Sequence, residues 1–243
     1  MNGRAKSLLL LALLVAVVAS VWPLATGREA DWAPGLAGSS ARLLFRFLTI
    51  TFGLGAWFLS QSLISARGFG DGTIGDAVHD WTAPMHDWLA RRPPVANALL
   101  VTSSGCIDAF GIFLLGSSLF GPSLRPGIGL LLVFALRQVA QLTCALPMPP
   151  GMIWRHPGVP SLLVTYHVAN DYFFSGHTAI AVLGAIEVAK IAPPWAALAA
   201  AVVACLEGLT VLVLRAHWTM DVLAGAVAAC CAAGIAATIC TGF

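Results

Sequence analysis

Long apolar stretches separated by short polar segments dominate the chain. Each stretch is close to the roughly 20 residues that a helix needs to cross the hydrocarbon core of a bilayer. Seven of them can be read, at residues 7–24, 43–63, 97–118, 127–147, 176–192, 195–214 and 219–240. The pattern therefore predicts an all-α, polytopic bundle of membrane helices.

The amino-acid composition supports this interpretation. Hydrophobic residues make up 58% of the 243 residues and charged residues only 10%, whereas an ordinary soluble domain carries about 25% charged residues. The net charge is only +2 and the chain has no run of basic residues. We therefore expect a multi-pass integral membrane protein, and nothing in the composition indicates nucleic acid as a partner.

The first apolar stretch stands apart from the others. It covers residues 7–24, follows Arg4 and Lys6, and is succeeded by small residues. These features suit either a cleaved signal peptide or a retained anchor, and the length of the stretch favours an anchor. We therefore divide the chain into an N-terminal segment and loop, 1–42, and a membrane domain, 43–243.

The polar connections point to one side of the membrane. With seven helices of alternating direction, the starts of the fifth and seventh stretches lie on the same side. All six histidines fall in the segments on that side: His79, His86, His156, His167, His177 and His217. Because chance would scatter them over both sides, their gathering indicates a functional site at this surface.

The first motif at that surface is a histidine followed four residues later by an aspartate, His217 and Asp221. On a helix this spacing places both side chains on one face. The carboxylate can then accept a proton from one imidazole nitrogen, which leaves the other nitrogen free to attack phosphorus. The chemistry expected of such a pair is group transfer in two steps through a phosphohistidine intermediate.

The second motif is Ser175-Gly176-His177, at the start of the fifth stretch. Ser175 is predicted to cap a helix that begins here, and Gly176 lets a phosphate approach the backbone closely. The helix N-terminus also offers unpaired N–H groups to an anion. His177 can protonate a leaving oxygen and later deprotonate an acceptor hydroxyl. Either motif alone is more often a plain interfacial feature, but together they indicate a phosphotransfer site that needs no metal or soluble cofactor.

Two further charged residues are candidates for binding the substrate. Arg137 lies within an apolar stretch, where a charge is costly and usually functional. It is a candidate for phosphate binding, with a structural ion pair to Asp108 as the alternative. Asp171 precedes His177 by six residues and binds either the acceptor hydroxyl or a cationic headgroup, unless it is an ordinary loop carboxylate.

A short repeat lies before the third apolar stretch. His79-Asp80-Trp81 recurs seven residues later as His86-Asp87-Trp88. Two His-Asp pairs would suit a metal ion, but the spacing is typical of an amphipathic helix that lies in the membrane interface with its two tryptophans as anchors. We expect the interfacial helix, and the six cysteines show no spacing typical of metal ligands either.

The two motifs resemble a known group of lipid enzymes. Residues 171–178 (DYFFSGHT) and 217–222 (HWTMDV) are similar to the active-site motifs of the sphingomyelin synthase branch of the type 2 phosphatidic acid phosphatase superfamily. Residues 137–150 resemble that branch's span with an internal arginine and a Leu-Pro-x-Pro turn. Residues 91–100 resemble the plant phosphatidylcholine:diacylglycerol cholinephosphotransferases. The resemblance covers roughly 43–235.

This resemblance implies a six-span helical core to which the N-terminal apolar segment is an addition. In the family the matching residues form a His-His-Asp triad, which carries over onto His177, His217 and Asp221. It also implies membrane lipids as partners, with a phospholipid as donor and diacylglycerol or ceramide as acceptor. The sequence leaves the oligomeric state open.

One departure from the superfamily bears on the substrate. Lipid phosphate phosphatases carry an arginine six residues before the second histidine, where this chain has Val211. A phosphomonoester is nearly a dianion and needs several cations, whereas a phosphodiester is a monoanion and needs fewer. Arg215 can partly replace the missing cation in phosphate binding. We therefore expect transfer of a headgroup, phosphocholine by resemblance, with hydrolysis of phosphatidic acid-type monoesters as the alternative.

Overall fold

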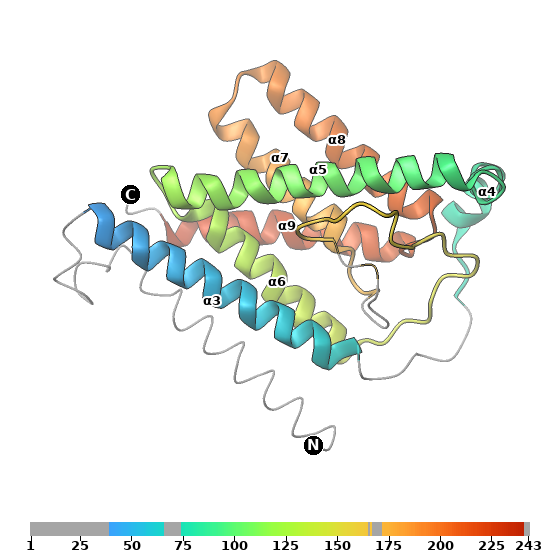
Figure 1. Cartoon of the computed structure of the whole chain (residues 1–243), viewed down its shortest axis with the longest axis horizontal. Coiled ribbons are helices and arrows are strands. Elements are labelled where there is room, and N and C mark those ends of the chain that lie inside the picture. The colour runs from blue at the N-terminus through green and yellow to red at the C-terminus, as the bar shows by residue number, and fades with distance from the viewer. Residues whose placement is uncertain (1–38, 66–73, 165, 167–171, 241–243) are drawn as a thin grey trace.

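The computed structural model describes residues 39–65, 74–164, 166 and 172–240, and this part of the chain contains helices and no strands (Figure 1). The helices are α3 (Ser39–Ser65), α4 (Ala77–Ala90), α5 (Pro93–Phe120), α6 (Arg125–Thr143), α7 (Gly176–Ile191), α8 (Pro194–Val213) and α9 (Thr219–Ile239). The predicted all-α fold is confirmed. The predicted stretch 7–24 lies outside the described residues, and the division of the chain at residue 42 stays a prediction.

Five of these helices are long and apolar enough to cross a membrane: α3, α5, α6, α8 and α9. They agree with the predicted apolar stretches to within a few residues, because hydrophobicity alone defines where a membrane helix can run. The multi-pass, membrane-embedded architecture is therefore confirmed. Proline lies in the first turn of α5, α6 and α8. Proline has no N–H, but the N–H groups of a first turn have no partner within the helix, so proline is well tolerated there and favours the start of a helix.

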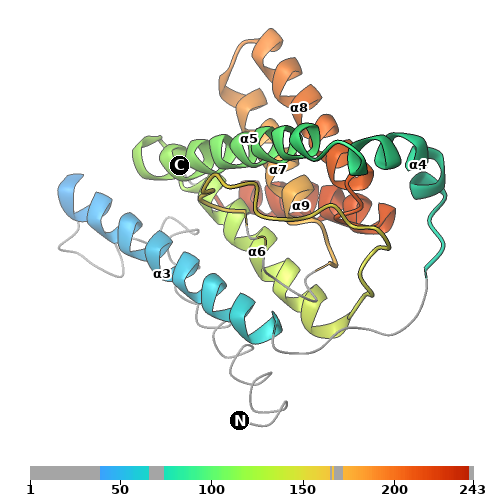
Figure 2. The same ribbon diagram turned by 45° about the vertical axis from the view of Figure 1, so that its right-hand side comes forward.

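The fifth predicted stretch, 176–192, forms α7 and differs from the other five that the structure describes. The helix has 16 residues, fewer than the roughly 20 that a spanning helix needs. It packs against α5, α6, α8 and α9 (Figures 1 and 2), and eight of its residues are buried. α7 is therefore the central helix of the bundle, and its first turn is held in place from several sides.

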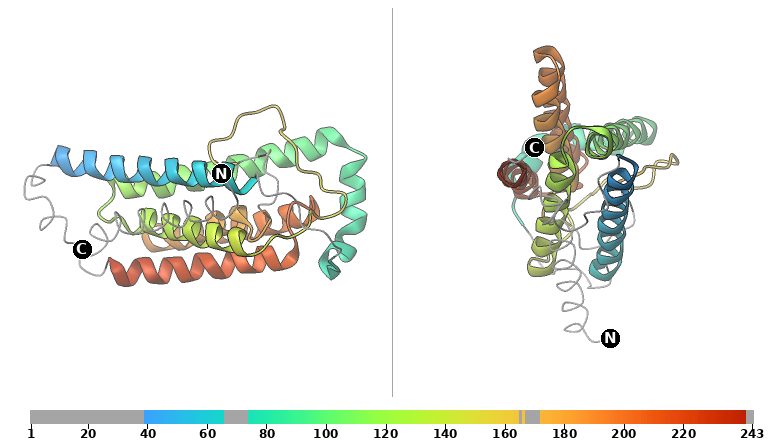
Figure 3. Two further views of the ribbon diagram at one scale, coloured as in Figure 1. Left: turned by 90° about the horizontal axis from the view of Figure 1, so that it is seen from below. Right: turned by 90° about the vertical axis from the view of Figure 1, so that its left-hand side faces the viewer.

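The connections gather at one end of the bundle. The described part of the chain between α6 and α7 runs past α4 and returns to the start of α7 (Figures 1 and 2). α4 itself lies across this end rather than along the bundle (Figure 3). Trp81 and Trp88 are 77% and 38% exposed, while His79 and His86 are buried. The predicted amphipathic helix is confirmed, with its two tryptophans on the outer face.

The start of α7 and the first turns of α9 approach each other closely at this end. The Ser175 N–H donates a hydrogen bond to the Asp221 carbonyl oxygen at 3.0 Å. One turn further along α9, a Cβ on Gly225 would lie 2.6 Å from the Ser175 carbonyl oxygen. Backbone cannot move aside as a flexible side chain can, so only glycine allows the two helices to lie this close.

Replacing Gly225 by alanine is therefore expected to destabilise the protein, because the added methyl group forces α9 away from the start of α7. Overpacking of this kind costs about 1–3 kcal/mol. The melting temperature in detergent should fall for Gly225→Ala. It should stay unchanged for Gly234→Ala in the same helix, where a Cβ meets nothing within 4 Å. Equal effects of the two substitutions would contradict the close-packing argument.

Candidate active site

A cavity of about 70 Å³ lies where the starts of α7 and α9 meet the connection that precedes α7. The two histidines of the sequence motifs, His177 and His217, line it together with Arg137 and Gly176. Much of the remaining wall is aromatic, from Trp57, Phe134, Trp154, Tyr166 and Tyr172. The volume is that of a few water molecules, which is enough for a small headgroup but not for a whole lipid, so the acyl chains must extend toward the opening.

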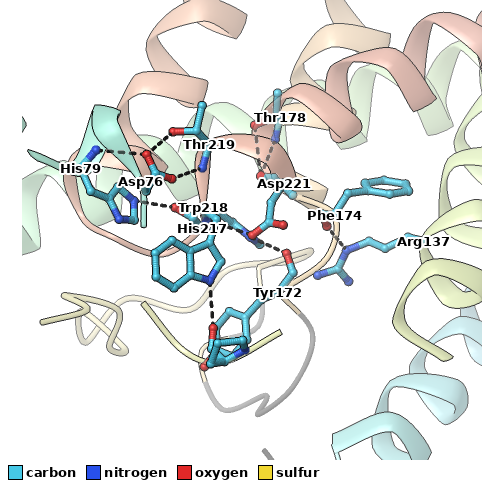
Figure 4. Close-up of polar contacts among 12 residues, drawn as sticks. Asp76, His79, Arg137, Tyr172, Phe174, Thr178, His217, Trp218, Thr219 and Asp221 are labelled. Atoms are coloured by element: carbon cyan, nitrogen blue, oxygen red, sulfur yellow. Dashed lines mark hydrogen bonds and ion pairs between the residues drawn. The ribbon is translucent and has the colours of Figure 1, made fainter. Parts of the chain in front are cut away.

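His217 is held by one of its two ring nitrogens. Its Nδ1 lies 2.8 Å from the Tyr172 carbonyl oxygen and 3.6 Å from Oδ2 of Asp221 (Figure 4). A carbonyl oxygen can only accept a hydrogen bond, so Nδ1 carries the proton. In the neutral ring Nε2 then has the free lone pair, and the side chain lines the cavity. The tautomer is the one that a nucleophilic histidine requires.

Asp221 performs two tasks at the start of α9. Its Oδ2 accepts a hydrogen bond from the Trp218 N–H at 2.9 Å, which caps the helix. The prediction that His217 and Asp221 share one face of a helix is wrong, because this capped helix begins at Thr219 and His217 precedes it. The two side chains are still close, with Oδ2 of the fully buried Asp221 3.6 Å from Nδ1 of His217.

His177 lies in the first turn of α7, and Ser175 caps this helix as predicted. The Ser175 hydroxyl oxygen accepts from the Thr178 N–H at 3.3 Å and from the Thr178 hydroxyl at 3.0 Å. The His177 ring meets Trp154 edge to face, with ring centroids 5.0 Å apart. Its Nε2 is buried and has no hydrogen-bond partner among the described residues, so a ligand oxygen in the cavity can take that place.

Arg137 reaches the cavity from α6. It is only 6% exposed, and its Nε–H donates to the Phe174 carbonyl oxygen at 3.0 Å (Figure 4). A Cβ on Gly176 would lie 3.2 Å from this Nε, so the glycine gives the guanidinium room beside the start of α7. The alternative role for Arg137, an ion pair with Asp108, is not observed. That carboxylate instead accepts hydrogen bonds from Ser161, Leu162 and Leu163.

The structure brings together some of the sequence-predicted residues and not others. His177, His217, Arg137 and Gly176 line one cavity, while Ser175 and Asp221 hold the two helix starts that carry the histidines. Arg215 does not line the cavity, and its Nη1 donates to the Pro150 carbonyl oxygen at 3.0 Å. Asp171 lies outside the described residues.

Sequence reasoning missed the Tyr172 carbonyl and the aromatic wall. A backbone acceptor carries no signal in residue type. The aromatic residues come from segments far apart in the chain, with Trp57 on α3, Phe134 on α6, and Trp154 and Tyr166 in the connection between α6 and α7. Only their shared cavity identifies them as a set.

The fold and this cavity define a multi-pass membrane protein that can bind an anionic group between two histidines and an arginine. The chain belongs to the AtPDCT1/2 family, the phosphatidylcholine:diacylglycerol cholinephosphotransferases, whose model matches residues 75–238. Comparison with curated proteins and with solved structures found no match.

Membership of this family makes the chain a phosphocholine transferase of membrane lipid metabolism. The predicted resemblance to the phosphatidylcholine:diacylglycerol cholinephosphotransferases is confirmed. The matched region begins just before α4 and ends within α9, so it contains both histidine motifs and Arg137. It does not contain α3, which supplies Trp57 to the cavity.

Proposed function

We propose that the chain moves phosphocholine from phosphatidylcholine to diacylglycerol, in two steps, through a phosphohistidine intermediate on Nε2 of His217. The observation that carries this proposal is the fixed tautomer of His217. Its Nδ1–H is bound by the Tyr172 carbonyl, and the ring lines the same cavity as His177 and Arg137. Nucleophile, acid and cation therefore face one small space.

In the first step, the lone pair of His217 Nε2 attacks the phosphorus of the donor. The bond between phosphorus and the diacylglycerol oxygen breaks, and that oxygen takes a proton from His177, which enters the step as an imidazolium beside the bound phosphodiester anion. The attacking ring keeps its proton on Nδ1 and becomes cationic. The buried charge of Asp221 stabilises this form at 3.6 Å. Diacylglycerol leaves, and phosphocholine remains on the histidine.

In the second step, the hydroxyl group of another diacylglycerol attacks the same phosphorus. His177, which lost its proton in the first step, accepts the proton of this hydroxyl group. The phosphorus–nitrogen bond breaks, and His217 regains its lone pair. The two steps balance, so a cycle needs no further reactant than the two lipids.

The charges in the cavity match a phosphodiester. Arg137 is the one cation among the described residues that line it, and a phosphodiester carries one negative charge where a phosphomonoester carries nearly two. A guanidinium also presents several N–H donors in a fixed plane, of which Nε–H is bound to Phe174. This hydrogen bond to the backbone just before α7 fixes the orientation of the guanidinium.

The aromatic wall suits a quaternary ammonium group. Trp57 stacks on Phe134 with ring centroids 4.6 Å apart, and Trp154 meets Tyr166 at 5.1 Å. None of the described lining residues is acidic. A primary ammonium needs hydrogen-bond acceptors, whereas trimethylammonium has no N–H and is bound well by aromatic faces.

Trp57→Leu is accordingly expected to reduce the preference for phosphatidylcholine over phosphatidylethanolamine as donor by about thirtyfold, the scale of a desolvated cation–π contact. Trp57→Phe keeps an aromatic face and should retain most of the preference. The measurement is kcat/KM for each donor with the same fluorescent acceptor. A loss that is equal for both donors would remove Trp57 from headgroup recognition.

The direct test of the proposed function uses the purified full chain in detergent. Phosphatidylcholine is supplied together with fluorescent diacylglycerol, and in parallel with fluorescent ceramide. We expect fluorescent phosphatidylcholine as the product. Fluorescent sphingomyelin alone would replace diacylglycerol by ceramide as acceptor. Release of phosphate from phosphatidic acid, without any transfer product, would overturn the proposal in favour of a phosphatase.

A further inference from the structure

The seven-residue repeat of α4 turns its histidines toward the backbone of the α8–α9 corner. His79 Nε2 donates to the His217 carbonyl oxygen at 3.0 Å, and His86 Nδ1 donates to the Val213 carbonyl oxygen at 2.9 Å. Both carbonyls only accept, so each of these nitrogens carries a proton. The two histidines are 4% and 5% exposed, and they hold the corner at two points four residues apart.

A third point of attachment comes from Asp76, immediately before α4. Its Oδ1 accepts from the Val78 and His79 N–H groups at 3.0 and 3.2 Å, which caps α4. The same carboxylate accepts from the Thr219 N–H and the Thr219 hydroxyl, both at 2.7 Å (Figure 4). One aspartate therefore closes the first turns of both α4 and α9.

The charge of Asp76 suits this double role. Burial alone would raise the pKa of its carboxyl group, but the hydrogen bonds from Thr219 and His79 outweigh burial and hold the pKa below its ordinary value. Asp76 is therefore ionised at neutral pH. Its charge also faces the positive end of two helix dipoles.

We propose that α4 is a clamp that positions the nucleophile, with Asp76, His79 and His86 as positioning residues for His217. The clamp is needed because His217 precedes α9 and is not held by helical hydrogen bonds. The corner also contains Arg215 at φ 52°, a conformation that side chains rarely adopt. Attachment at residues 213, 217 and 219 fixes the backbone on both sides of the imidazole.

The outer face of α4 carries residues typical of a membrane interface. Trp81 and Met85 are 77% and 55% exposed, and the Arg92 guanidinium lies 4.5 Å from the ring centre of Trp88. Tryptophan and arginine together are typical of the membrane interface. We infer that this outer face of α4 contacts the lipid surface, while its inner face binds the α8–α9 corner.

This inference rests on the proposed function, because it assigns a purpose to the placement of His217. A displacement of about 1 Å at a reacting group can cost a hundredfold in rate. His79→Leu is therefore expected to lower kcat between about tenfold and a hundredfold with little change in KM for the donor. His79→Gln offers an amide N–H near the place of Nε2 and should restore most of the rate. His86→Asn, which mimics Nδ1, should likewise retain more activity than His86→Leu.

The matched controls are the carboxylates that follow each histidine in the repeat. Asp80 and Asp87 are exposed, and Asp80→Asn and Asp87→Asn should transfer phosphocholine at the rate of the unmodified chain. Melting temperatures in detergent separate loss of positioning from loss of folding. A His79→Leu variant that transfers at the full rate would overturn the clamp.

A second measurement does not depend on activity. Amide hydrogen exchange over residues 213–222 should be faster in Asp76→Ala than in the unmodified chain, because the Thr219 N–H loses its acceptor. Asp80→Asn should leave it unchanged. If the unmodified chain transfers nothing, the proposed function fails while the exchange result still tests the clamp. Unchanged exchange in Asp76→Ala would refute the clamp whatever the activity.

Discussion

Replacing His217 by alanine is expected to abolish headgroup transfer, with kcat lowered by about 10³-fold or more. The variant has no atom to form the phosphorus–nitrogen bond, and a direct reaction between the two lipids would need the donor and acceptor to meet at phosphorus in the same small cavity. The His217 ring lines the cavity, so its removal enlarges an existing space rather than opening a new one in the apolar core. The variant should therefore keep its melting temperature in detergent within a few degrees.

The intermediate itself provides a second measurement on the same variant. Phosphatidylcholine labelled at phosphorus, supplied without acceptor, should leave label on the unmodified protein and none on His217→Ala. A phosphorus–nitrogen bond is lost in acid and survives alkali, which distinguishes it from a phosphate ester. His156→Ala is the matched control, because His156 is exposed and does not line the cavity. Transfer by His217→Ala at an undiminished rate would exclude a covalent intermediate on this residue.

The helices were predictable because a membrane imposes one strong rule on sequence. A segment in hydrocarbon must be apolar, long and helical, so the ends of α5, α6, α8 and α9 could be placed to within a few residues. The cap of α7 was predictable for a different reason. Ser175 is the residue type whose hydroxyl accepts from the first turn, and Thr178 is its donor in the structure.

The arrangement around His217 was predictable only in part. The spacing of His217 and Asp221 indicated that the two would meet, and they do, at 3.6 Å. It did not indicate where the helix begins. Asp221 accepts a hydrogen bond from the Trp218 N–H, and α9 begins at Thr219, after His217. Nor did it indicate the hydrogen-bond acceptor of His217, since the Tyr172 carbonyl belongs to a segment 45 residues away.

The repeat in α4 was also predictable only in part. Its spacing correctly placed Trp81 and Trp88 on an outer face, because amphipathicity is a property of one helix. The partners of His79 and His86 lie 138 and 127 residues away, and no pattern within the helix refers to them. The histidines looked like metal ligands or interfacial residues from the sequence, whereas the fold uses them as backbone donors.

Arg137→Leu is expected to have the second largest effect on transfer. Removing one donor that stabilises charge in a transition state costs about 10²–10³ in kcat, and Arg137 is the one cation among the described lining residues. The leucine keeps the bulk of the buried stem, so α6 should still pack. The measurement is kcat and KM for phosphatidylcholine, beside Arg155→Leu as the control. Arg155 is exposed and donates to Asn97 outside the cavity.

Arg137→Lys separates the charge of the side chain from its geometry. Lysine keeps one positive charge but cannot bind Phe174 through an Nε–H while presenting further donors to the substrate. If charge alone matters, Arg137→Lys should recover nearly all the activity that Arg137→Leu loses. We expect it to recover only a small part, because the hydrogen bond to Phe174 fixes the position of the guanidinium. Phe174 lies in the segment that joins Tyr172, which orients His217, to His177. Full activity in Arg137→Leu would mean that neutral donors suffice for the phosphodiester, and Arg137 would then have a structural role only.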